Sequence, residues 1–217
     1  LLRTADWQGQ WIGRPLEGQE DSQPCPYLRH EFTAKGAIRR ARIYATSRGL
    51  FELYLNGKRV GSDHFTPGWT DYCKRISYFV YEVAADLVPG QNVIGAILAD
   101  GWFAGHLTWF HRRHLYGDQL SILLQIEIEY GDGRREIVAT DPKWKTSLGP
   151  LLKSDCYNGE TYDARLEMSG WNRPGFDDSH WQNAVVIASP KARIVAKRNL
   201  PVRKQEELAV VAQTEPL

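Results

Sequence analysis

The sequence predicts an all-β fold, a β-sandwich with long loops and little helix. Short segments of alternating apolar and polar residues recur along the chain, separated by Gly, Pro and Asn-Gly turns. This pattern is typical of sandwiches. A clean helical stripe is absent, although residues 83–88 could form one helical turn before Pro89-Gly90. The alternation does not determine the connectivity, so the preferred jelly roll stands beside other sandwich topologies.

The strands are predicted from two hairpins outward. Residues 51–55 alternate, Asn56-Gly57 suits a type I′ turn because both residues tolerate positive φ, and residues 58–61 return. Residues 121–130 alternate as a half-buried strand, and residues 134–140 return after a Gly-Asp-Gly turn. Further strands are predicted at 41–46, 76–83 and 92–99. The last is almost entirely apolar, which indicates a central position in a sheet.

Two segments are predicted to be long loops, 101–120 and 155–178. Loops of this length between strong strands are often functional. The chain carries eight Trp and ten Tyr. We expect most of these rings in the core and one or two exposed, because an aromatic face also stacks on the apolar face of a sugar.

The charge balance and the cysteines limit the class of protein. A formal net charge of +1 argues against a nucleic-acid partner, and no apolar run is long enough to span a membrane. The first residues lack the layout of a signal peptide. Because Cys25, Cys73 and Cys156 are odd in number and widely spaced, we expect buried or half-buried thiols in a reducing, cytoplasmic compartment.

Carboxylates on the two loops are the first candidates for chemistry. Asp100 and Asp118 flank one loop, and Glu160 and Asp163 lie on the other. Two carboxyls on opposite sides of a bond could serve a glycosidase. In the alternative, Asp163 and Arg165 form an ion pair that holds the loop, and Glu160 caps a backbone turn.

Metal sites are weaker candidates. His106, His111 and His114 could ligate zinc, but two arginines lie between them and no regular element holds the rings. Calcium is more plausible, because loop carboxylates and carbonyl oxygens are its usual ligands. Its candidate ligands are Asp100, Asp118, Asn158 and Asp163. Nucleophile elbows, phosphate loops and dinucleotide fingerprints are absent from the sequence.

A series of short motifs resembles, in order, the N-terminal β-sandwich domain of bacterial α-L-rhamnosidases. The segment Tyr157-Asn158-Gly159-Glu160-Thr161-Tyr162-Asp163-Ala164-Arg165 is the most specific of them. One such motif would be weak evidence, whereas eleven in the same order are strong evidence. The others are Trp7-x3-Trp11-Ile12-Gly13 and the segments 28–32, 41–44, 49–52, 55–61, 67–72, 75–78, 100–105, 116–118 and 201–207.

The resemblance implies a galactose-binding-like jelly roll over residues 1–190 and an exit segment over 191–217 that leads to further domains. Those enzymes are inverting glycosidases that release terminal α-L-rhamnose, with the catalytic acid and base in a downstream helical barrel. This chain would then be a fragment without activity of its own, docked on the downstream domains. Some related sandwiches bind rhamnose through calcium, and others only pack against the barrel. Both roles stay open here. The candidate substrate-binding residues are Asp100, Trp102, Tyr116, Asp118, Glu160, Asp163 and Arg165.

Overall fold

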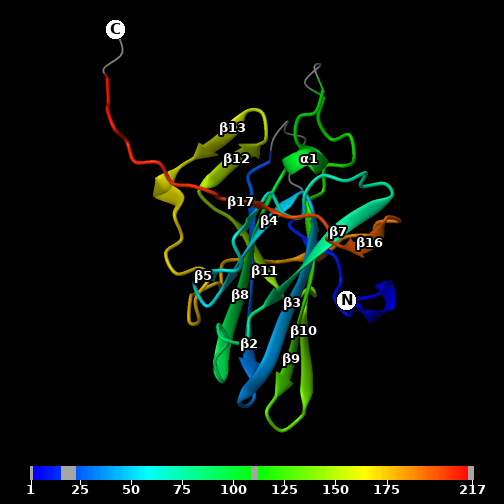
Figure 1. The fold of residues 1–217 in the computed structure, drawn as a ribbon. Coiled ribbons are helices and arrows are strands. Elements are labelled where there is room, and N and C mark those ends of the chain that lie inside the picture. Colours follow the sequence, from blue (N-terminus) through cyan, green and yellow to red (C-terminus); the bar gives the residue numbers. More distant parts are fainter. Residues whose placement is uncertain (1, 16–22, 109–111, 215–217) are drawn as a thin grey trace.

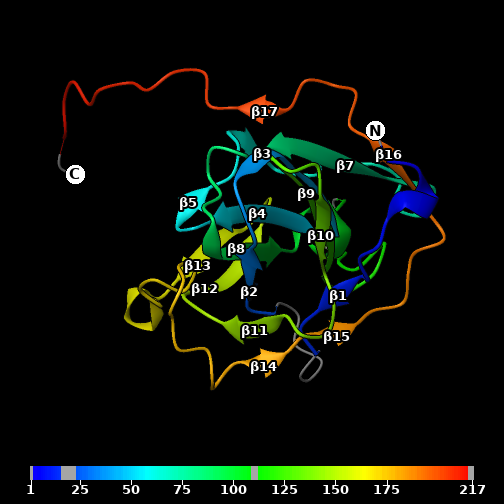
Figure 2. The same cartoon turned by 90° about the horizontal axis from the view of Figure 1, so that it is seen from below.

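The computed structural model describes residues 2–15, 23–108 and 112–214. Its regular structure in these ranges is almost entirely β-strand, with one short helix, α1 (Gly101–Ala104), and single 3-10 turns at Thr4–Asp6 and Ala164–Leu166. Two sheets face each other around an apolar core (Figures 1 and 2). The predicted all-β sandwich is confirmed, and the jelly-roll connectivity stays a prediction.

The first sheet has the strand order β15-β1-β9-β3-β7-β16, and β10 also pairs with β9. Neighbouring strands are antiparallel except β16, which runs parallel to β7. The strands are β1 (Ile12–Gly13), β3 (Ile38–Arg48), β7 (Arg75–Glu82), β9 (Ser121–Tyr130), β10 (Arg135–Ala139), β15 (Val185–Val186) and β16 (Arg193–Ala196).

The second sheet has the order β14-β11-β2-β8-β4-β5, so β8 lies between β2 and β4, in the central position predicted for residues 92–99. Two small two-stranded sheets, β12–β13 and β6–β17, lie outside the sandwich. The strands are β2 (Pro26–Ala34), β4 (Leu50–Leu55), β5 (Lys58–Arg59), β6 (Asp63–His64), β8 (Gly90–Ala99), β11 (Lys145–Leu148), β12 (Leu151–Asp155), β13 (Gly159–Tyr162), β14 (Gln182–Asn183) and β17 (Val202–Arg203).

Both predicted hairpins are confirmed. Asn56 and Gly57 have φ values of 52° and 85°, as a type I′ turn requires. On β9, Ile122, Leu124 and Ile126 are buried as expected. The strand is more than half-buried, because Gln125 is also buried and accepts a hydrogen bond from Gln8 N at 2.9 Å. The N-terminal segment therefore covers part of the outer face.

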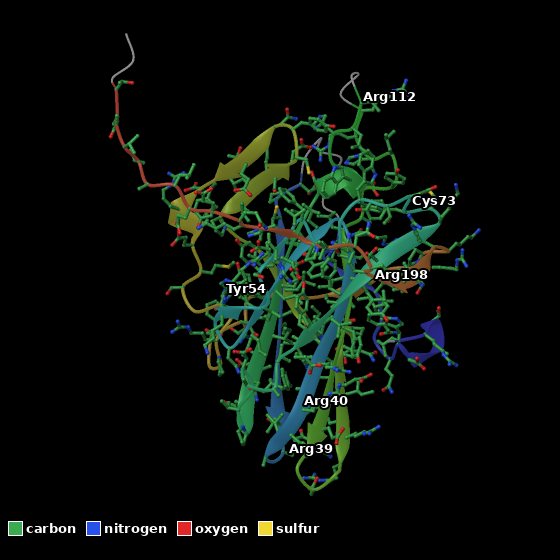
Figure 3. The ribbon with its side chains drawn as sticks, viewed as in Figure 1. Arg39, Arg40, Tyr54, Cys73, Arg112 and Arg198 are labelled. Carbon is green, nitrogen blue, oxygen red and sulfur yellow. The ribbon has the colours of Figure 1, made fainter. Side chains whose placement is uncertain are left out.

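Three expectations are wrong. Residues 83–88 form a turn closed by Asp86 N to Val83 O at 3.0 Å, not a helical turn. The segments 101–120 and 155–178 contain α1, β13 and a 3-10 turn rather than loop alone. All three cysteines are free, but Cys73 and Cys156 are exposed and Cys25 alone is buried. Cys73 lies at the surface near the start of β7 (Figure 3).

Residues 168–181 cover the outer face of the second sheet. Trp171 packs edge-on against Tyr27 and Tyr54, and a Cβ on Gly95 beneath it would come within 2.6 Å of the Trp171 ring. Arg29 fastens this segment: its Nε donates to Trp171 O at 2.8 Å, and its guanidinium pairs with Asp178 and Glu31. The segment packs onto the sheet through this buried arginine.

The exit segment also packs on the sandwich. β16 adds to β7, Lys197 N donates to Tyr78 O at 2.9 Å, and β17 pairs with β6. Figure 2 shows this segment running along the outside of the sandwich. No helix in the described part of the chain is long and apolar enough to cross a membrane.

Candidate functional site

The α1 end of the sandwich gathers most of the predicted site. In Figure 1, α1 lies at the same end as the β12–β13 hairpin. The chain turns sharply from β8 into α1 at Gly101, whose φ of 51° and close approach to Leu50 disfavour any side chain. Asp100 precedes this turn, and its buried carboxylate pairs with Arg113. Burial raises the pKa of Asp100 to about 6, against the opposing pull of Arg113.

A second polar network joins the loop after α1 to the hairpin. Asp155 Oδ2 accepts a hydrogen bond from His106 N at 2.8 Å and lies 3.0 Å from His106 Nδ1, and its Oδ1 accepts from the backbone of Tyr157 and Asn158. Burial by itself would raise the pKa of Asp155, but these hydrogen bonds dominate and hold it at about 2. Asp155, which anchors the hairpin, is not among the site residues predicted from the sequence.

Three aromatic rings gather at α1: the half-buried Trp102 on α1 itself and the exposed Phe65 and Trp69. Trp69 and Trp102 stack with ring centroids 6.2 Å apart and planes 3° apart, and Phe65 tilts against Trp102 at 6.0 Å. We call these three rings the aromatic plate. Tyr116 packs on the buried Tyr72, with ring centroids 5.1 Å apart, and is partly buried against the core.

A groove of about 310 Å³ opens next to the plate, between β4, β8, β6 and the hairpin. Its polar groups come from Glu52, His64, Ser154 and Glu160, and Phe65 links it to the plate. Glu52 is held in place, since Tyr54 Oη donates to it at 3.0 Å and Arg59 Nη2 pairs with it at 3.0 Å. The lining residues are Leu50, Phe51, Glu52, His64, Phe65, Ile97, Ala99, Leu151, Ser154 and Glu160.

Two of the seven predicted site residues lie at or beside the groove. Glu160 lines the groove, and Trp102 lies in the plate beside it. Asp163 and Arg165 instead form the expected loop-holding ion pair, at 2.6 Å, and Asp163 Oδ1 also accepts from Arg165 N. The contact with Arg165 lowers the pKa of Asp163.

The remaining three residues also lie outside the groove lining. Asp100 forms an ion pair with Arg113, Tyr116 packs on Tyr72, and Asp118 is exposed. The groove residues Glu52, His64, Phe65 and Ser154 are not among those predicted from the sequence. The position of Glu52 on the outward face of an alternating strand was the signal that could have found it.

The metal candidates do not assemble. Within the described ranges, no three His, Cys, Asp or Glu side chains are grouped so as to hold an ion. Asp100 and Asp163 are paired with arginines, so the four calcium candidates do not fit a shared ion. Of the zinc candidates, His106 faces Asp155, while His111 lies outside the described residues.

Comparison with known proteins decides the family. The model of the "Alpha-L-rhamnosidase N-terminal domain" matches residues 36–206. The chain belongs to this family. It is 46% identical over 192 residues to an α-L-rhamnosidase of Streptomyces avermitilis, covering 87% of this chain and 18% of that protein.

Solved structures of the family agree with the fold. The Streptomyces avermitilis enzyme complexed with L-rhamnose superposes with a TM-score of 0.82 at 43% identity, over 85% of this chain and 18% of that chain. The Aspergillus terreus enzyme gives 0.89 at 35% identity, over 94% and 24%. The chain therefore spans about a fifth to a quarter of the length of these relatives.

Proposed function

We propose that this N-terminal domain recognises a sugar unit of rhamnose-containing glycosides in the groove, within a polypeptide that removes terminal α-L-rhamnose. The proposal rests on the side chains that line the groove, which are two carboxylates, an imidazole and a hydroxyl beside an exposed aromatic ring. Carboxylates accept hydrogen bonds from sugar hydroxyls, and Phe65 offers a face to pyranose C–H groups. A volume of about 310 Å³ suits a single sugar unit.

The same groups argue against cleavage of the glycosidic bond by this domain. Inversion requires one carboxyl as acid and a second as base, with room for a water between them. Glu52, the other carboxylate among the groove-lining residues, is already bound by Tyr54 and Arg59. It is therefore not available as a catalytic partner for Glu160. We therefore assign the chemistry to another domain and recognition to this one. The domain alone should leave an aryl α-L-rhamnoside intact.

Calorimetric titration of the chain with L-rhamnose tests the proposal. We expect a saturable heat of binding. The affinity for L-rhamnose should fall at least tenfold in Glu160→Gln. It should be unchanged in the control Glu206→Gln, which alters an exposed carboxylate in the exit segment. Because the calcium candidates do not form a site, the heat should survive a chelator. If the folded chain gave no heat of binding in any titration, sugar recognition would be contradicted.

A second candidate function is structural packing without a sugar ligand. All four residues of β13 are exposed, and so are two rings of the plate. A two-stranded hairpin is marginally stable by itself, so a neighbouring domain would be its natural support. This function predicts no heat with sugar, together with a lower unfolding temperature of the longer polypeptide when β13 is altered.

A further inference from the structure

The dipeptide Asn-Gly occurs twice in the chain, each time at the turn of a hairpin. Asn56-Gly57 joins β4 to β5, and Asn158-Gly159 lies at the turn between β12 and β13. In this dipeptide the backbone nitrogen of the glycine can attack the side-chain amide carbon of the asparagine, because no Cβ hinders the approach. The attack requires an asparagine side chain that is free to turn toward the next residue, and the two copies differ in this freedom.

The side chain of Asn56 is held on both of its polar atoms. Its Nδ2 donates to Asp86 O at 2.9 Å and to Asn92 Oδ1 at 2.8 Å. Its Oδ1 accepts from Val93 N at 2.9 Å. The amide of Asn56 would have to break these three hydrogen bonds to reach the nitrogen of Gly57, so the folded chain protects this copy.

The side chain of Asn158 is much less restrained. Asn158 and Gly159 are both exposed, and a Cβ on Gly159 would meet no atom within 4 Å. Within the described part of the chain, this side chain makes one hydrogen bond, from its Nδ2 to His106 Nδ1 at 3.0 Å. The same Nδ1 lies 3.0 Å from Asp155 Oδ2, and while it donates a proton to Asp155 it cannot accept one from Asn158. The amide of Asn158 is therefore released whenever Nδ1 carries the proton.

The backbone around Asn158 also opens readily. The β12–β13 sheet has only two strands, lies outside the sandwich and exposes all four residues of β13. A hairpin of this kind is marginally stable, and marginal segments open locally while the rest of a protein stays folded. Opening gives the nitrogen of Gly159 access to the side chain of Asn158.

We propose that Asn158-Gly159 is a site of spontaneous deamidation, which detaches the hairpin from the loop after α1. The nitrogen of Gly159 loses its proton to water and forms a bond to Cγ of Asn158. The Cγ–Nδ2 bond breaks, and Nδ2 takes up a proton and leaves as ammonia, so that a cyclic imide remains. Water then adds to one of the two imide carbonyls, which opens the ring to aspartate or to isoaspartate. The reaction consumes one water and needs no other reactant.

Both products weaken the anchor of the hairpin. Each places a carboxylate beside Asp155, whose Oδ1 accepts from the backbone nitrogen of Asn158 at 3.0 Å, and like charges repel. Each also lacks the amide donor that faces His106. Isoaspartate lengthens the main chain before Gly159 and disturbs its pairing with Asp155. The inference is independent of the sugar proposal, because it needs no ligand in the groove.

Peptide mass spectrometry of the folded 217-residue chain, aged in mildly alkaline buffer, tests the modification. The peptide with Asn158 should gain the mass of an NH2-to-OH exchange at least tenfold faster than the peptide with Asn56. In urea the two copies should react at similar rates, because unfolding removes the hydrogen bonds that protect Asn56. Similar rates in the folded chain, or faster reaction at Asn56, would overturn the proposal. Asn158→Gln should abolish the mass gain in this peptide, since its longer side chain forms the ring far more slowly.

Hydrogen–deuterium exchange tests the release of the hairpin. Asn158→Asp reproduces one product, and amides in the segment 156–162 should exchange at least threefold faster in this variant than in the original chain. The control Asn199→Asp adds the same charge at an exposed position of the exit segment and should leave this segment unchanged. Unchanged exchange in Asn158→Asp, or an equal increase in both variants, would show that the product does not detach the hairpin and would overturn that part of the proposal.

Discussion

Replacing Arg29 with Met should lower the free energy of unfolding by about 3 kcal/mol. Arg29 is 1% exposed and fastens residues 168–181 through Asp178, Glu31 and the carbonyl of Trp171. Removing one side of a buried ion pair usually costs about 3–5 kcal/mol. The low end applies here, since the two carboxylates are 27% and 33% exposed and regain water.

Urea unfolding followed by Trp fluorescence measures this loss of stability, because Trp171 and Trp181 both lie in the segment 168–181 that Arg29 fastens. In thermal unfolding, a loss of about 3 kcal/mol in a domain of this size should lower the melting temperature by about 6–12 °C. Arg39→Met is the control: Arg39 pairs with Glu129 but is 69% exposed and lies at the far end of the sandwich (Figure 3), so its loss should cost less than about 1 kcal/mol. Equal losses of stability in the two variants would show that the buried Arg29 does not fasten residues 168–181.

Three further predictions concern packing, pH and thiols. Gly95→Ala should cost about 1–3 kcal/mol in urea unfolding because its Cβ would meet the Trp171 ring, and Gly131→Ala, with more room, should cost less; the reverse order would contradict this packing. Because burial raises the pKa of Asp100 from 3.8 to about 6, protonation favours the folded state, and this contribution to stability should decline as pH rises from about 4 to about 6. In Asp100→Asn that decline should disappear, and an unchanged pH profile would count against it. A maleimide should label Cys73 and Cys156 in the folded chain but not Cys25, whose burial raises its pKa to about 12; three labels on the folded chain would be the opposite result.

The strands that were predicted correctly are those with local signals. Asn56-Gly57 and the alternation of residues 51–55 and 121–130 depend on neighbours in sequence. The helical turn predicted at 83–88 does not form, because side chains from outside this segment bind its backbone groups. Asn56 Nδ2 donates to Asp86 O, Asn92 Nδ2 donates to Val88 O, and Asn92 Oδ1 accepts from Val88 N. Parallel pairing of β16 with β7 joins residues far apart, and no local pattern shows it.

The candidate site was predicted only in part for a similar reason. Glu160 and Trp102 were found because they lie in distinctive motifs, and both lie at or beside the groove. Glu52 and His64 appear in the sequence as ordinary outward positions, and only the packing of the hairpin over β4 and β8 turns them into a groove wall. Asp163 and Arg165 lie two residues apart in the sequence and form an ion pair with each other, so they do not line the groove.

An NMR titration of the ¹⁵N-labelled chain with L-rhamnose tests sugar recognition in the groove residue by residue. We expect saturable chemical-shift changes confined to the amides around His64, Ser154 and Glu160, with the amides of the Asp163–Arg165 turn unaffected. Shifts that cluster elsewhere, or none at millimolar sugar, would contradict recognition in the groove.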